Sequence, residues 1–250
     1  MSFPLDGRRV LLTRPAGYGD SLKVALKTAG AQVLHCPTLD LVPNQAPLPV
    51  LNSPPDWIVF VSPFAVKTGW PRLPSVWQQA ARLAAVGPGS ASALTKRRVT
   101  SVVAPEHGGG ADDLLALPDF NPQAGQSVLI VCGENGRQQL QQTLRSRGIH
   151  VVEAVVYDRQ PAAEQLVIPE EWQQNALDFL IVTSAAGLEY LLGMAGPSAL
   201  QWLKQSRLVT VSERLAQAAL MAGFTDPLVA VGADDAALLA ALSASPGSRK

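Results

Sequence analysis

The chain has 250 residues, of which 47% are hydrophobic and 16% are charged, so it is not disordered and can bury one large or two small cores. Lysine plus arginine and aspartate plus glutamate number 20 each. The resulting formal net charge of zero argues against nucleic acid or an anionic membrane as the main partner. The sequence has neither a membrane-spanning apolar run nor a recognisable secretion signal, which predicts a cytoplasmic protein.

The first elements predicted along the chain are a strand, a helix and a second strand. Apolar runs at residues 8–13 and 32–36 predict the strands, and the amphipathic stretch 22–29 predicts a helix that Gly30 ends. Residues 36–55 are rich in proline, which cannot donate a hydrogen bond within a central strand. We therefore expect an extended connector there.

The next elements alternate in the same way. The continuous apolar run at 58–61 predicts a strand that is covered on both faces, and Ser62-Pro63 predicts the start of a helix. Further strands are predicted at 82–86 and 101–104. A leucine-rich helix is predicted at 111–117, with two aspartates near the positive end of its dipole.

Nearly all of this pattern occurs a second time. The stretch Arg9–Leu41 aligns without a gap on Ser127–Arg159, at an offset of 118 positions. The segments that begin at Asp56 and Arg82 recur at offsets of 122 and 125, and a second leucine-rich helix is expected at 233–242. Repeated alternation of strands and helices predicts two related α/β domains, each with a parallel, doubly wound sheet of about five strands.

The repeat does not say which halves share a domain. Two extended segments, Thr38–Pro47 and Val156–Pro161, lie at equivalent ends of the two copies and suit crossings between domains. They favour an interleaved pairing, in which the first and last quarters form one domain.

The residues at the expected strand ends are mostly serine, threonine, glycine and alanine. In an open parallel sheet, ligands bind beyond the carboxyl ends of the strands, where helix N-termini favour anions. Each such loop alone is also what an ordinary cap or turn looks like. Together, six loops predict an anion site built from backbone amides; they begin at Thr13, Ser62, Gly87, Gly133, Thr183 and Ser212.

Other motifs carry less information. The segment VGPGSAS is similar to a dinucleotide-binding loop, whereas no GxxxxGK[ST] motif is present. The three histidines lack metal-ligand spacing, and Cys36 and Cys132 are expected to be free thiols, so no metal site is predicted. Two alternatives to an enzyme without cofactors remain open: a two-domain protein that binds a small anion, and a nucleotide-dependent transferase with twin Rossmann-like domains.

Five motifs in order resemble one enzyme family. These are VLLTRP, DWIVFVSPFAV, AVGPGSASAL, VLIVCGENGR and IVTSAAGLEYL, and with their spacing they resemble uroporphyrinogen-III synthase from about Val10 to Leu242. The resemblance implies two flavodoxin-like α/β domains joined by a two-stranded linker, one domain inserted in the other. It places the first domain at 1–38 and 162–250, the second at 42–155, and the linker strands at 36–43 and 154–163.

The resemblance also implies a function. Members of the family close hydroxymethylbilane, a linear tetrapyrrole with eight carboxylates, while inverting its last ring and releasing water. A monomer with no metal or organic cofactor and an active site between the domains is implied, and transient hand-over of the substrate from hydroxymethylbilane synthase is a further expectation.

Site residues follow where the motifs match. Tyr157 in VVYDR matches the family's candidate for assisting departure of the hydroxyl. Glu213 lies where many members have a Gly-Pro loop, and its charge would repel a carboxylate, so the contribution of that loop is open. The expected substrate-binding residues are Thr13, Arg14, Ser62, Pro63, Phe64, Gly87, Ser90, Gly133, Arg137, Thr183, Ser184, Ala185 and Ser212.

Overall fold

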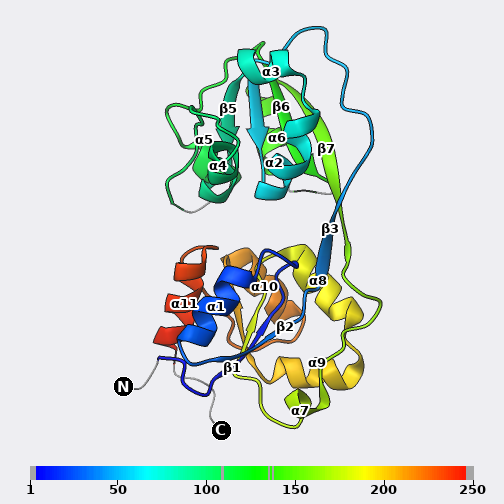
Figure 1. Ribbon diagram of the computed structural model, residues 1–250, viewed down its shortest axis with the longest axis vertical. Coiled ribbons are helices and arrows are strands. Elements are labelled where there is room, and N and C mark those ends of the chain that lie inside the picture. The colour runs from blue at the N-terminus through cyan, green and yellow to red at the C-terminus, as the bar shows by residue number, and fades with distance from the viewer. Residues whose placement is uncertain (1–3, 108–109, 135, 137, 246–250) are drawn as a thin grey trace. The chain divides into compact units, whose positions relative to one another are not determined.

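The computed structural model describes residues 4–107, 110–134, 136 and 138–245 (Figure 1). The chain divides into two compact units. The terminal unit comprises Met1–Asp40 and Gln160–Lys250, and the central unit comprises Leu41–Arg159. The central unit is thus inserted into the sequence of the terminal unit, as the interleaved pairing predicts.

The terminal unit is built on a five-stranded sheet with the order β10-β9-β8-β1-β2, in which neighbouring strands pair in parallel. Its strands are β1 (Arg9–Leu12), β2 (Gln32–His35), β8 (Phe179–Ile181), β9 (Arg207–Thr210) and β10 (Leu228–Val229). Its helices are α1 (Asp20–Thr28), α7 (Glu170–Gln173), α8 (Ala185–Met194), α9 (Pro197–Lys204), α10 (Glu213–Met221) and α11 (Asp235–Ala244).

Both faces of this sheet are covered by helices. Successive side chains of a strand point to opposite faces, so a single strand contributes to the cores on both sides. Val10 and Leu12 of β1 join a core with α1 and α11. Leu11 joins a second core with α8, α9 and α10. All three side chains are fully buried, which explains why β1 is continuously apolar.

The central unit is built on a second five-stranded sheet, with the order β3-β7-β6-β4-β5. Its strands are β3 (Leu39–Pro43), β4 (Trp57–Phe60), β5 (Arg82–Ala85), β6 (Ser127–Gly133) and β7 (His150–Pro161). Its helices are α2 (Pro63–Gly69), the 3-10 turn η1 (Trp70–Arg72), α3 (Ser75–Ala80), α4 (Pro88–Thr95), α5 (Ala111–Leu115) and α6 (Gln139–Ser146).

The strand expected at residues 101–104 is wrong. This segment forms only an isolated parallel bridge between Val103 and Ala84. The fifth strand of the central sheet is instead β3, which lies in the proline-rich connector and pairs with β7. Pro43 closes β3, so the proline ends this strand rather than preventing it.

The two units are connected within β3 and β7, since the boundaries at Asp40/Leu41 and Arg159/Gln160 fall inside these strands. The predicted fold class is confirmed: two parallel-sheet α/β units, one inserted in the other, joined by a two-stranded linker.

Candidate active site

The centre of the candidate site in the central unit is Tyr157, on the long strand β7. The side chain is only 2% exposed. Its phenolic oxygen lies 3.1 Å from the hydroxyl oxygen of Ser62, and Nη2 of Arg159 donates a hydrogen bond to it at 3.3 Å. The ring of Phe64 stands perpendicular to the Tyr157 ring, with the centroids 5.1 Å apart. Three neighbours therefore fix both the ring and its oxygen.

Ser62 is placed by the junction of β4 and α2. It has an extended backbone and caps α2, because its Oγ accepts the N–H of Ala65 at 3.0 Å. Pro63 occupies the first turn of that helix, where its missing N–H costs nothing. The serine hydroxyl thus has a structural partner on one side and Tyr157 on the other.

Gly133 lies directly beside Tyr157. The register of β6 on β7 shifts between Cys132 and Gly133, so that Gly133 is opposite Tyr157. A Cβ atom added at Gly133 would lie 2.3 Å from Cε2 and 2.4 Å from Cζ of Tyr157. The phenol ring occupies the space that any other residue at this position would need.

The remaining predicted loop of the central unit begins α4. Gly87 is the N-cap residue with an extended backbone, and the side chain of Ser90 is only 3% exposed. The N–H of Ser90 donates to the Gly87 carbonyl at 3.1 Å. Arg137 lies outside the residues that the structure describes.

In the terminal unit, threonines and serines lie where the strands end. The hydroxyl of Thr13, which is 3% exposed, donates to the carbonyl of Ile181 at 2.8 Å. Ser184 caps α8 by accepting the N–H of Gly187 at 3.0 Å, and Ser212 caps α10 by accepting the N–H of Leu215 at 3.4 Å. These caps leave further N–H groups of the first helical turns directed beyond the sheet edge. Thr183 directly precedes the cap residue Ser184 and is half-buried, whereas Ala185, which follows it, is exposed.

Arg14 already has an anionic partner. Its Nη1 lies 2.6 Å from Oδ1 of Asp235, its Nη2 donates to the carbonyl of Ala233, and its side chain is only 12% exposed. A carboxylate of a ligand must therefore compete with Asp235 for this guanidinium.

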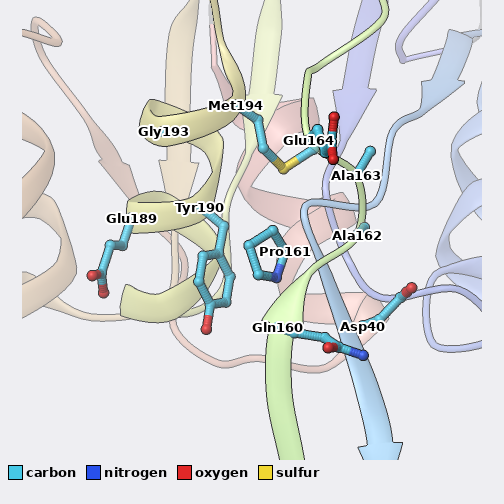
Figure 2. Close-up of a pocket in the computed structure, with 10 residues that line it drawn as sticks. All are labelled: Asp40, Gln160, Pro161, Ala162, Ala163, Glu164, Glu189, Tyr190, Gly193 and Met194. Carbon is cyan, nitrogen blue, oxygen red and sulfur yellow. The ribbon is translucent and has the colours of Figure 1, made fainter.

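A cavity of about 760 Å³ in the terminal unit lies between α8 and the segment after β7 (Figure 2). Tyr190 and Met194 of α8 line it together with the carboxylates of Asp40, Glu164 and Glu189. Three carboxylates would repel an anionic ligand, so the volume of this cavity does not make it the candidate anion site.

Two polar residues, one in each unit, were not predicted from the sequence. Arg159 follows Tyr157 by two positions, a spacing that places both side chains on the same face of a strand. The hydroxyl of Thr38, which is fully buried, donates to the carbonyl of Gly187 at 3.0 Å near the start of α8. Alternation along β7 could have identified Arg159; no sequence signal marked Thr38.

The comparisons with known proteins decide the family. The family model described as uroporphyrinogen-III synthase HemD matches residues 20–240. The chain belongs to the uroporphyrinogen-III synthase family. The uroporphyrinogen-III synthase of Escherichia coli K12 is 32% identical over 254 residues, which cover 93% of this chain and 99% of the relative. That of Salmonella typhimurium is 32% identical over 246 residues, which cover the same shares.

Solved structures agree with this fold. Uroporphyrinogen-III synthetase from Helicobacter pylori matches with a TM-score of 0.60 at 16% identity, covering 93% of this chain and 97% of that one. A mutant uroporphyrinogen-III synthase from Thermus thermophilus matches with a TM-score of 0.57 at 19% identity, covering 88% and 91%. As a uroporphyrinogen-III synthase, the protein is an enzyme of tetrapyrrole biosynthesis, and the two alternatives left open by the sequence are not supported. Among the described residues, no helix has the length and apolar character to cross a membrane.

Proposed function

We propose that this uroporphyrinogen-III synthase closes hydroxymethylbilane with inversion of the last ring, and that the hydroxyl pair of Tyr157 and Ser62 assists the departure of the substrate hydroxyl. In this reaction the electron-rich pyrrole expels the hydroxyl group, which leaves as water once it has received a proton. The last ring then attacks through its substituted carbon, the spiro intermediate fragments, and the ring recloses inverted with loss of a proton. The net change is the loss of one water molecule.

The hydrogen bonds around Tyr157 supply a proton donor. Ser62 and Tyr157 carry two hydroxyl protons, and the single contact between their oxygens uses one of them. One lone pair of the Ser62 oxygen is taken by the N–H of Ala65, and one of the Tyr157 oxygen by Arg159. Whichever oxygen donates in the shared contact, one hydroxyl proton is not used by that contact. This is the observation that carries the proposal.

The two hydroxyls differ in their burial, which indicates different roles in proton transfer. Tyr157 is nearly covered, whereas Ser62 is half-buried. A proton can therefore reach a ligand through Ser62, while Arg159 stabilises the negative charge that develops on the phenol oxygen. A phenol is a weak acid, which suits a substrate whose own electrons expel the leaving group.

Binding of the substrate carboxylates is assigned to the helix N-termini. Backbone N–H groups at the starts of α4, α8 and α10 are preorganised donors, and the helix dipoles favour anions there. The spontaneous reaction closes the linear substrate without inversion, so the protein must select one folded conformer of the substrate. Many weak backbone contacts to many carboxylates are suited to that selection.

The experiment generates hydroxymethylbilane in situ and separates the uroporphyrin isomers after oxidation. With the protein present, we expect uroporphyrin III to dominate, whereas the control without it should give uroporphyrin I. Formation of isomer I alone in the presence of folded protein would overturn the proposal.

A further inference from the structure

The ring of Tyr157 is held on several sides by the central unit. Phe64 packs against it edge to face, and Ser62 and Arg159 hold its oxygen. Nη1 of Arg159 also donates to the carbonyl of Glu134 at 3.0 Å, which ties the phenol to the residue after Gly133. Since the ring is fixed by these groups, it cannot yield cheaply to a new neighbour.

Gly133 lies against the Tyr157 ring and, having no side chain, leaves room for it. The irregularity between Cys132 and Gly133 skips one residue of β7, so that Val155 is opposite Cys132 and Tyr157 is opposite Gly133. Such irregularities re-aim side chains locally. The Cβ that an alanine would add falls 2.3–2.9 Å from three atoms of the Tyr157 ring, closer than non-bonded carbons approach.

The duplicated stretch of the sequence provides an internal comparison. At the offset of 118 positions, Gly133 corresponds to Pro15 and Tyr157 to Leu39. The first copy therefore pairs Leu39 with a proline, which has a Cβ atom. The second copy pairs Tyr157 with a glycine, which has none. Ring and glycine occur together in one copy and are both absent from the other.

We propose that Gly133 is a positioning residue for Tyr157, and that its missing side chain serves the ring rather than a substrate carboxylate. This inference deepens the proposed function and rests on it for its kinetic consequence. A side chain at residue 133 displaces the phenol from Ser62 and Arg159, so the hydroxyl pair loses its shared hydrogen bond. The effect on catalysis is therefore transmitted through Tyr157 alone.

The test combines Gly133→Ala with two substitutions of Tyr157. In the wild-type background, Gly133→Ala is expected to lower Tm by at least about 4 °C and kcat by roughly tenfold or more, with KM nearly unchanged. Tyr157→Leu removes the ring and reproduces the residue of the first copy, so in that background Gly133→Ala should change Tm by less than about 1 °C. Tyr157→Phe keeps the ring but not the hydroxyl, so Gly133→Ala should still lower Tm and leave the remaining kcat nearly unchanged.

Each outcome decides between the two roles of Gly133. A rise in KM on Gly133→Ala in every background would show that residue 133 contacts the substrate, and would overturn the inference. If Gly133→Ala does not fold, recovery of folding in Gly133→Ala/Tyr157→Leu supports the inference, and failure of both variants overturns it. The Tm measurements need no enzymatic turnover, so failure of the proposed reaction and failure of this inference are distinguishable.

Discussion

The oxygen of Ser62 that accepts the N–H of Ala65 at the start of α2 is the same oxygen that lies 3.1 Å from the phenol of Tyr157. One serine thus connects the first turn of a helix with a side chain that comes from β7, a strand of the linker between the units. Its loss should affect both the stability of the central unit and the proton donor of the proposed reaction.

Tyr157→Phe should reduce activity without abolishing it. A general acid contributes about 10²–10⁴ to a rate, and an acid as weak as a phenol should lie near the lower end. We therefore expect kcat to fall by about 10² with little change in KM. Tyr190→Phe is the matched control, because Tyr190 lines the acidic cavity of the terminal unit, and its kcat should stay near that of the wild type. An unchanged kcat for Tyr157→Phe would remove this residue from the mechanism.

Ser62→Ala should act differently from the other cap substitutions. Ser62, Ser184 and Ser212 each accept a backbone N–H at a helix start, so each alanine variant should lower the free energy of unfolding by about 1 kcal/mol. Ser62→Ala should in addition lower kcat, and that loss should largely disappear in a Tyr157→Phe background. Additive losses of kcat in the double variant would show that the two hydroxyls act independently.

Much of the fold could be predicted because it is repeated. Each copy alone is a loose pattern, but the gapless match of Arg9–Leu41 on Ser127–Arg159 indicated the order of the elements. The extended segments at the equivalent ends of the two copies then favoured the interleaved pairing. The sequence did not reveal that β3 completes the central sheet in place of a strand at residues 101–104. Proline content argued locally against a strand there, whereas the family resemblance implied linker strands at 36–43 and 154–163. Neither signal showed that β3 belongs to the central sheet, because pairing between strands is a tertiary property.

The candidate site was less predictable than the fold. Helix starts at Ser62, Ser184 and Ser212 follow from cap chemistry, and all three serines do cap helices. Their roles toward a substrate remain predictions. The ion pair of Arg14 with Asp235 could not be anticipated, since the residues are far apart in the sequence and no local pattern links them.

Arg98→Gly should stabilise the central unit. Arg98 follows α4 with φ 66°, and its N–H donates to the carbonyl of Thr95. The equivalent position after α10 is Gly223, with φ 88° and the corresponding hydrogen bond to Leu220. A side chain in this conformation costs about 1–2 kcal/mol. Glycine avoids that cost, but it loses more conformational entropy on folding, which offsets part of the gain. Thermal unfolding should show a gain of about 0.5–1 kcal/mol for Arg98→Gly, with the opposite sign for Gly223→Ala.

The pH dependence of stability should include a contribution from Cys132. Burial, with a smaller contribution from Glu153, raises the pKa of this thiol from 9.0 to about 11, while Arg159 opposes the shift. Between these values the folded protein keeps a proton that the unfolded chain releases, so the free energy of unfolding falls as the pH rises through that window.

Cys132→Ala should remove this contribution to the decrease in the free energy of unfolding with rising pH. Urea unfolding of wild type and variant at about pH 8 and about pH 10 would measure the difference, because the cavity left by the thiol costs the same at both values. Cys36, whose pKa burial also raises to about 11, remains in both proteins and cancels. Parallel pH profiles for wild type and variant would contradict the shift.

Asp235→Asn should show whether Arg14 serves the substrate. The substitution weakens the competing acceptor of the guanidinium, so KM should fall by about fivefold if Arg14 contacts a carboxylate, the equivalent of about 1 kcal/mol. Ser21→Ala, which removes another hydrogen bond to Asp235 but leaves the ion pair, is the control. No change in KM for Asp235→Asn would show that Arg14 does not contact the substrate and only connects the loop after β1 to the start of α11.

The most direct test of the central claim titrates protein against the spontaneous closure of hydroxymethylbilane and measures the fraction of isomer III. Spontaneous closure gives isomer I, so the fraction of isomer III reports how often the protein acts first. We predict that this fraction rises towards one with wild-type protein, and that Tyr157→Phe reaches the same plateau only at a higher protein concentration. A fraction that stays at the spontaneous level at every concentration of folded wild-type protein would contradict the account.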